Sequence, residues 1–153
     1  MNIFVTNSLK SLGVFKDFSD GSIKSVFENS NKGILEFTLL FNKPEFDVLC
    51  VPTHHFCNLG CKMCHLTNKG LNKQMIPVQA EDFIEALVKS VCYVNEWQQE
   101  KENIISKEKC IKRTQKKKLL ISFMGVGEPL LNLSLIEKVY LNEEYIKNIL
   151  EYS

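Results

Sequence analysis

The sequence has no long apolar run, no recognisable signal peptide and no strong excess of charge. None of its apolar stretches approaches the ~20 residues needed to cross a bilayer. The start of the chain, MNIFVTNSLK, lacks the basic and apolar segments of a secretory signal. With a formal net charge of +1 over 153 residues, no overall field draws the chain to nucleic acid or to a membrane. We therefore expect a cytoplasmic protein without a membrane partner, whose six cysteines stay reduced rather than paired in disulfides.

A fourth cysteine with matching spacing is also missing from the main cysteine cluster. Cys57, Cys61 and Cys64 form a C-x3-C-x2-C pattern, and thiolates are soft ligands that suit zinc or iron–sulfur clusters. A structural zinc site normally needs four ligands, so zinc would require one of the three histidines, His54, His55 or His65. Three thiolates can instead hold three irons of a [4Fe–4S] cluster and leave the fourth iron open. A cluster with S-adenosylmethionine at the open iron is a source of radical chemistry.

Strand and helix signals alternate along most of the chain. The expected strands are at residues 22–28, 34–41, 46–51 and 119–124, and the expected helices are at 77–97 and 134–152. A turn-forming cluster at 29–33 joins the first two strands as a hairpin. Strand, loop and helix then follow twice, which indicates parallel βαβ units with right-handed crossovers. We expect an α/β fold with a β-rich extension over residues 1–45 and a core of about two βα units over 46–153.

A second motif, Gly125-x-Gly127-Glu128-Pro129, follows the expected strand at 119–124. Ligands of open α/β sheets bind at the carboxyl ends of the strands, where both this motif and the cysteine cluster are expected. Glycine permits close backbone approach, and the Glu128 carboxylate can accept hydrogen bonds from a cationic amine. An ordinary strand-to-helix turn also explains the glycines.

The two motifs together resemble the radical S-adenosylmethionine superfamily. Its signature is C-x3-C-x-Φ-C, with Met63 here at the position Φ that is often aromatic, and its second motif binds the methionyl amine of the cofactor. The resemblance implies part of a (β/α) barrel, an electron donor such as a flavodoxin or ferredoxin, and a [4Fe–4S] cluster on Cys57, Cys61 and Cys64. It also implies S-adenosylmethionine bound by Met63, Gly125, Gly127, Glu128 and Pro129.

More of the sequence, from about residue 20 to 140, fits one branch of that superfamily. The stretch FMGVGEPLLN at 123–132 is similar to the adenosine-C2 methyltransferases of 23S rRNA and tRNA, and to related C8-methylating enzymes of antibiotic resistance. Asp20-Gly21, Leu49-Cys50-Val51 and the segment 69–73 fit as well. The resemblance implies an RNA substrate, radical methylation of an adenine carbon, and a role for Cys50 in resolving a covalent enzyme–RNA intermediate. Taken alone, Cys50 is typical of a buried strand cysteine.

The resemblance also has gaps. No cysteine follows Cys110, whereas the family implies a methyl-carrying cysteine near the far end of a longer barrel. The segment 52–56, PTHHF, departs from the family's small polar residues. We expect a truncated enzyme, which a second chain could complete, or an inactive remnant. A zinc-binding module that uses its lysine-rich segment 107–118 to bind nucleic acid is the alternative, although a solvated loop explains that segment more simply.

Overall fold

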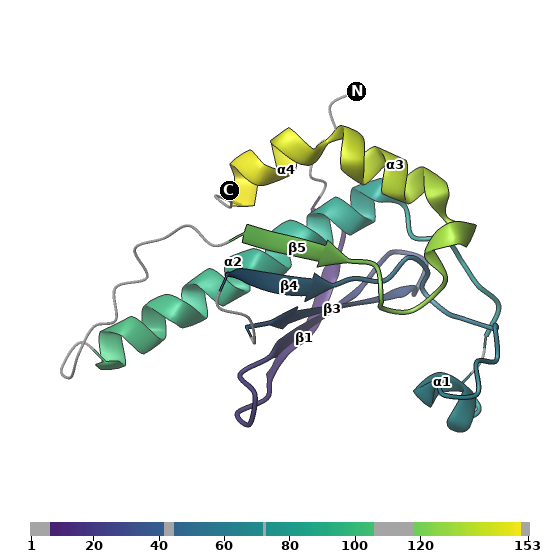
Figure 1. Ribbon diagram of the computed structural model, residues 1–153, viewed down its shortest axis with the longest axis horizontal. Helices are drawn as coiled ribbons and strands as arrows, with labels where there is room; N and C mark the ends of the chain where they lie inside the picture. Colours follow the sequence, from purple (N-terminus) through teal and green to yellow (C-terminus); the bar gives the residue numbers. More distant parts are fainter. Residues whose placement is uncertain (1–6, 42–44, 72, 106–117, 151–153) are drawn as a thin grey trace.

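The computed structural model describes residues 7–41, 45–71, 73–105 and 118–150, and within them it contains one five-stranded sheet. The strands are β1 (Lys10–Lys16), β2 (Ile23–Glu28), β3 (Ile34–Leu40), β4 (Phe46–Cys50) and β5 (Lys118–Ser122). The helices are α1 (His65–Asn68), α2 (Ala80–Ile105), the 3-10 turn η1 (Pro129–Leu131), α3 (Leu133–Leu141) and α4 (Glu143–Leu150). Figure 1 shows α2, α3 and α4 on one side of the sheet. None of the helices in this part of the chain is long and apolar enough to span a membrane.

The sheet is mixed and open. Its strand order is β1–β2–β3–β4–β5, with antiparallel pairs up to β4 and a parallel pair of β4 with β5. The chain reaches β5 from β4 by way of α2, as a parallel pair requires. The sheet does not close into a barrel within the described residues, so the partial barrel that the family resemblance implies stays a prediction. Because β3 pairs with β4, the boundary expected at residues 45 and 46 falls inside this one sheet, and the division into domains also stays a prediction.

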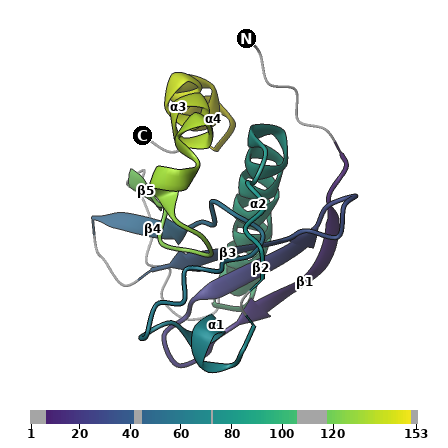
Figure 2. The ribbon, with the colours of Figure 1, turned by 90° about the vertical axis from the view of Figure 1, so that its right-hand side faces the viewer.

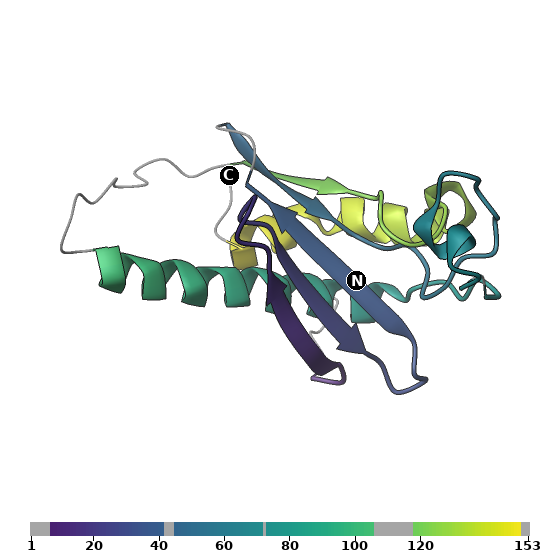
Figure 3. The same cartoon turned by 90° about the horizontal axis from the view of Figure 1, so that it is seen from below.

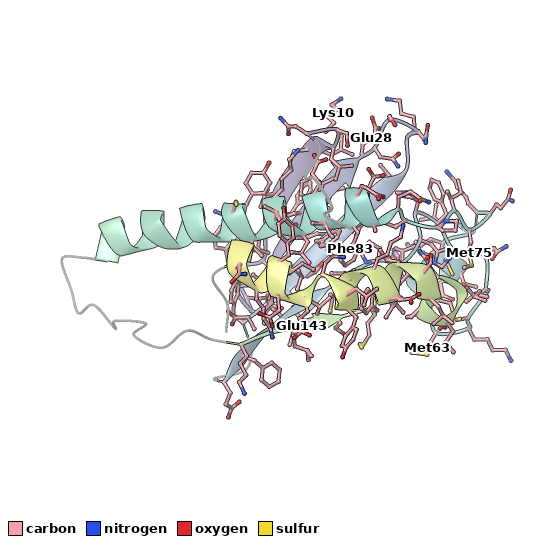
Figure 4. All side chains as sticks on the ribbon, turned by 90° about the horizontal axis from the view of Figure 1, so that it is seen from above. Lys10, Glu28, Met63, Met75, Phe83 and Glu143 are labelled. Atoms are coloured by element: carbon pink, nitrogen blue, oxygen red, sulfur yellow. The ribbon has the colours of Figure 1, made fainter. Side chains whose placement is uncertain are left out.

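Side-chain alternation in the strands decides which face of the sheet is buried. On β2, β3 and β4 every second residue is buried, and the apolar members of this set form one core with the buried residues of α2. The Phe83 ring of α2 lies 5.3 Å from the Phe37 ring of β3 and 5.9 Å from Phe123 after β5, measured between centroids. Phe83 therefore lies at the centre of the packed layer, between the helices and the sheet (Figure 4). Figures 2 and 3 show that the helices leave the other face of the sheet uncovered.

The observed elements follow the expected ones, although α2 spans Ala80–Ile105 where a helix over 77–97 was expected. There are three further differences. The expected helix at 134–152 is two helices, because Asn142 follows α3 and its side-chain amide donates to the Lys138 carbonyl at 2.7 Å. Strand β1 was not expected, since its register shift between Ser11 and Gly13 breaks any regular alternation. The short α1 was also not expected. The lysine-rich segment 107–117 lies outside the described residues.

A buried carboxylate fastens the start of the described chain to α2. Glu85 is fully buried, and its oxygens accept hydrogen bonds from Leu9 N at 2.9 Å, Ser8 N at 3.0 Å and Lys89 Nζ at 2.7 Å. Lys89 also donates to the Leu9 carbonyl at 3.0 Å. Burial alone would raise the pKa of Glu85, but the hydrogen bonds from Lys89, Leu9 and Ser8 outweigh it and lower the pKa from 4.5 to about 2.

Replacing Glu85 with glutamine should lower the free energy of unfolding at pH 7 by about 1.5–3 kcal/mol, the range for hydrogen bonds to a charged group. The folded-state pKa lies below the unfolded value. The stabilisation is therefore complete above pH ~4.5 and is lost as the pH falls toward about 2. Urea unfolding at several pH values measures the difference, with Glu137→Gln on the exposed side of α3 as the control. A difference between the wild type and Glu85→Gln that persists at low pH would contradict this account.

Candidate functional site

Two loops leave the sheet side by side at the carboxyl ends of β4 and β5. The parallel register pairs Leu49 with Ile121 and Cys50 with Ser122, so both strands end at the same edge. The loop after β4 carries the three clustered cysteines and leads to α1, and the loop after β5 carries the glycines and Glu128. Figure 1 shows both loops and α1 at this end of the molecule. The sequence prediction that the two motifs share one edge of the sheet agrees with this arrangement.

Backbone hydrogen bonds join the two loops beyond the strands. Val51 N donates to the Ser122 carbonyl at 2.9 Å, and Gly125 N donates to the Val51 carbonyl at 3.0 Å. The Val126 carbonyl then accepts from Thr53 N at 3.0 Å and from His54 N at 3.2 Å. Residues 51–54 and 125–126 therefore form one connected unit, which extends the pairing of β4 with β5.

Both glycines are required by this contact between the loops. A β-carbon at Gly125 would lie 2.7 Å from the Val51 carbonyl carbon, too close for a real contact. A β-carbon at Gly127 would lie 2.7 Å from the Thr53 hydroxyl oxygen and would collide with the His54 ring, and Gly127 has φ of +106°. The sequence predicted that these glycines permit a close approach of the backbone. In the structure, the groups that approach them are Val51, Thr53 and His54 of the same chain. The role of the glycines in binding a cofactor stays a prediction.

Asn132 is a buried residue of this site that the sequence reasoning did not single out. Its side-chain amide donates to the Thr53 carbonyl at 2.8 Å and to the Val78 carbonyl at 3.2 Å. Val78 N donates to the same Thr53 carbonyl at 3.0 Å. Asn132 thus ties the loop after β4 to the chain before α2 and to the start of α3. The signal that could have identified Asn132 in the sequence is its position as the last residue of FMGVGEPLLN at 123–132.

The two adjacent histidines are buried beneath the loops. His54 is 1% exposed, and its Nδ1 lies 3.0 Å from the Thr53 hydroxyl. Burial lowers the pKa of His54, the neighbouring His55 lowers it further, and Glu128 opposes the shift. His55 is 6% exposed, with Nδ1 3.1 Å from the Ile34 carbonyl and Nε2 3.3 Å from the Asn29 amide. Both imidazole rings therefore have hydrogen-bond partners within the fold.

The three clustered cysteines lie further along the loop than the residues that pair with the glycine loop. Cys61 is exposed, Cys57 and Cys64 are half-buried, and all three are free thiols. A turn joins two of them, in which Cys64 N donates to the Cys61 carbonyl at 3.0 Å. Met63 is 94% exposed and lies at the outer end of the molecule (Figure 4).

The donors of this loop fit an iron–sulfur cluster in kind, since they are three accessible soft thiols on one segment. No group of three or more His, Cys, Asp or Glu side chains in the described residues is gathered closely enough to hold a metal ion. A metal would therefore have to draw the three thiols together, as expected where binding and local folding are coupled.

Glu128 and Pro129 form the start of the η1 turn. Glu128 Oε1 accepts a hydrogen bond from Leu130 N at 3.1 Å, and Pro129 is the first residue of the turn. The side chain is half-buried, so the carboxylate retains capacity to accept further donors. Glu128 is thus held beside Gly127 while it still reaches solvent.

Cys50 lies at the end of β4, on the face of the sheet that the helices leave uncovered. Its cross-strand neighbours are Thr38 on β3 and Ser122 on β5. Burial raises the pKa of the Cys50 thiol, so at neutral pH the thiol stays protonated. It would need a base or a bound partner to react as a thiolate.

Comparisons with known proteins show a shared fold. Neither a protein-family model nor a curated protein sequence matches the chain. Among solved structures, the fold is similar to that of a radical SAM methyltransferase from Sphaerobacter thermophilus, with a TM-score of 0.65 and 21% sequence identity. The similarity covers 90% of this chain and 35% of that chain, so the chain spans about a third of the length of that structure.

Replacing Gly127 with alanine should lower the free energy of unfolding by about 2–4 kcal/mol, because a β-carbon there meets both positive φ and a side-chain collision. Gly21→Ala is the matched control. Gly21 also has positive φ, at +75°, but nothing lies within 4 Å of its added β-carbon. Urea denaturation of both variants separates the cost of the positive φ from the cost of the side-chain collision. Equal losses of unfolding free energy in Gly127→Ala and Gly21→Ala would contradict the packing of His54 against Gly127.

Proposed function

We propose that this chain forms the cofactor-binding part of a radical S-adenosylmethionine enzyme. One observation carries the proposal. The loop with three free, accessible thiols and the loop with Gly127 and Glu128 leave the same edge of a parallel strand pair. The similarity of fold to a solved radical SAM methyltransferase supports it.

In this proposal Cys57, Cys61 and Cys64 would hold a [4Fe–4S] cluster, which when bound would supply the electron for reductive cleavage of S-adenosylmethionine. Glu128 accepts hydrogen bonds from the cationic amine of the cofactor, because its carboxylate is fixed by the η1 turn and is only half-buried. Gly125, Gly127 and Pro129 set the path of that loop, and the apolar Met63 side chain covers the adenine. The adjacent buried His54 stays neutral at pH 7, since burial lowers its pKa, and adds no charge to the site.

We further propose that the substrate is an adenosine of ribosomal or transfer RNA and that the product carries a methyl group on an adenine carbon. The support is the sequence FMGVGEPLLN at 123–132, together with the position of Cys50 at the end of β4. The Cys50 side chain lies on the uncovered face of the sheet, where a large substrate has access. An electron donor of the flavodoxin or ferredoxin kind, and a second polypeptide that completes the sheet beyond β5, belong to the same proposal.

The assignment of the cluster ligands predicts how iron is incorporated. After anaerobic reconstitution with iron and sulfide, the wild-type chain should hold about four irons, as a [4Fe–4S] cluster requires. Cys57→Ala, Cys61→Ala and Cys64→Ala should each lose most of that iron. Cys92→Ala is the matched control, because Cys92 is also an exposed free thiol but lies on α2. Tight stoichiometric zinc with no iron uptake would contradict the proposal and favour the zinc-binding alternative.

The role of Glu128 predicts a defect in cofactor binding. In the reconstituted protein, Glu128→Gln should weaken the binding of S-adenosylmethionine by about 10-fold, which corresponds to the loss of one charge-assisted hydrogen bond. Equilibrium dialysis measures the affinity, and Glu137→Gln on α3 is the control for loss of an exposed carboxylate. Release of 5′-deoxyadenosine under reducing conditions tests turnover. A wild-type chain that binds S-adenosylmethionine but releases no 5′-deoxyadenosine would be an inactive remnant.

A further inference from the structure

The loop between β4 and α2, which carries the three clustered cysteines, begins and ends in a paired stem, residues 53–57 and 73–78. Backbone hydrogen bonds join the two halves of the stem: Val78 N to the Thr53 carbonyl at 3.0 Å, His55 N to the Ile76 carbonyl at 2.9 Å and Lys73 N to the Cys57 carbonyl at 3.2 Å. The pairing of the stem therefore extends along the loop as far as Cys57.

The side chain of His55 fastens this stem to the turn between β2 and β3. Its Nδ1 lies 3.1 Å from the carbonyl of Ile34, the first residue of β3. Because a carbonyl only accepts hydrogen bonds, Nδ1 carries the hydrogen and Nε2 is the acceptor. A β-carbon at Gly33 would lie 2.7 Å from the His55 ring, and Gly33 is not among the glycines with positive φ. The space taken by the ring therefore explains the glycine in this turn.

Asn29 supplies the hydrogen-bond donor for Nε2 of His55, and its own orientation is fixed by the turn. Its Oδ1 accepts from Asn31 N at 3.1 Å and from Gly33 N at 2.8 Å. Its amide nitrogen therefore faces the other way, 3.3 Å from His55 Nε2 and 3.0 Å from Asp82 Oδ2. Asp82 lies in the first turn of α2. Hydrogen bonds thus connect the start of α2, the turn between β2 and β3, and the stem.

The outer part of the loop, residues 58–71, which we call the tip, contains a turn and a helix of its own. Cys64 N donates to the Cys61 carbonyl at 3.0 Å, and α1 begins directly after Cys64. Figure 1 shows α1 at the outer end of the loop, away from the helices that cover the sheet. Of the three thiols, that of Cys57 is thus on the fastened stem, and the other two share the tip.

Glycines flank the turn and the helix of the tip on both sides. Gly60 has φ of +67° and Gly70 has φ of +64°, and nothing lies within 4 Å of a β-carbon added at either position. The stem differs, because its His55 ring is packed against Gly33 and is only 6% exposed. The fixed part of the loop therefore ends near Cys57.

We propose that His55 is a positioning residue of the cysteine loop. It holds the stem against the turn between β2 and β3 and so places the Cys57 thiol before a metal binds, while Cys61 and Cys64 join as one unit from the tip. A ligand that is placed in advance needs less ordering on binding, which raises the affinity. Binding of a metal by these cysteines rests on the proposed function. The fastening of the stem rests on the contacts of His55 and Asn29.

Hydrogen exchange of the metal-free full chain tests the fastening. His55→Ala should speed amide exchange in the two halves of the stem by about 10-fold, as expected for the loss of about one net hydrogen bond. The comparison variant is Ile23→Ala. Ile23 is 1% exposed and lies at the opposite end of β2 from the turn. Its replacement lowers the global stability, but it should leave exchange through local opening of the stem unchanged.

Anaerobic titration of the full chain with cobalt(II), followed by thiolate-to-cobalt absorption, tests the effect on metal binding. His55→Ala should weaken cobalt binding by about 10-fold. His55→Asn should recover the affinity to within ~3-fold of the wild type, because the asparagine amide nitrogen replaces Nδ1 as donor to the Ile34 carbonyl. Asn31→Ala, an exposed position on the same turn, and Ile23→Ala should each change the affinity by less than ~2-fold.

Gly33→Ala tests the same contact from outside the cysteine loop. The added β-carbon displaces the His55 ring, so it should speed exchange of the stem and weaken cobalt binding by about 3- to 10-fold, without removing any side chain of the loop. Together with His55→Asn, this variant keeps the test available if His55→Ala does not fold.

The proposal would be overturned by unchanged stem exchange in both His55→Ala and Gly33→Ala, by an equal loss of cobalt affinity in Ile23→Ala, or by no recovery in His55→Asn. If His55 were itself a metal ligand, His55→Ala would weaken cobalt binding without faster exchange in the metal-free chain. Cobalt absorption that Cys57→Ala leaves unchanged would instead contradict the proposed ligands. The exchange measurements need no metal, so failure of the fastening is distinguishable from failure of the proposed function.

Discussion

The parallel pairing of β4 with β5 is the constraint on which the rest of the structure depends. Parallel strands need a long crossover between them, and the chain supplies it with α2, whose Phe83 packs on Phe37 of the sheet and on Phe123 directly after β5. The two strands consequently end at one edge. The hydrogen bonds between residues 51–54 and 125–126 carry their alignment into the loops. Any pair of loops that left the sheet in opposite directions could not form a common site.

The packing of the two loops explains several residue choices that composition alone does not. Gly125 and Gly127 have no side chains because Val51, Thr53 and His54 occupy the space. Asn132 is buried because its amide donates to the Thr53 and Val78 carbonyls. The Thr53 carbonyl also accepts from Val78 N, so the loss of Asn132 falls mainly on the Val78 carbonyl, where an unmade hydrogen bond costs about 1–3 kcal/mol. The loops are thus positioned by buried polar contacts and backbone pairing.

The sequence predicted the parts of the fold in which local pattern and tertiary packing agree. The turn signals that flank β2, the β-branched and aromatic content of β3, the apolar runs of β4 and β5 and the periodic face of α2 were readable, and with them the shared edge of the two motifs. The alternation of buried residues in β2 and β3 became clear only in the structure. Strand β1 was missed because its register shift at Gly13 removes the alternation. The histidines could not be interpreted from sequence because their partners are distant in the chain. His55 meets Asn29 and the carbonyl of Ile34, and the same Asn29 amide reaches Asp82, 53 residues away.

The two faces of the sheet differ, since the helices bury one face and leave the other, which carries Cys50, uncovered. The central claim concerns the cysteine loop, and electron paramagnetic resonance of the reduced, anaerobically reconstituted chain tests it most directly. If one iron of a three-cysteine [4Fe–4S] cluster is open, adding S-adenosylmethionine should shift the g values of the signal. A [4Fe–4S] signal that S-adenosylmethionine leaves unchanged, or no cluster signal at all, would contradict the account.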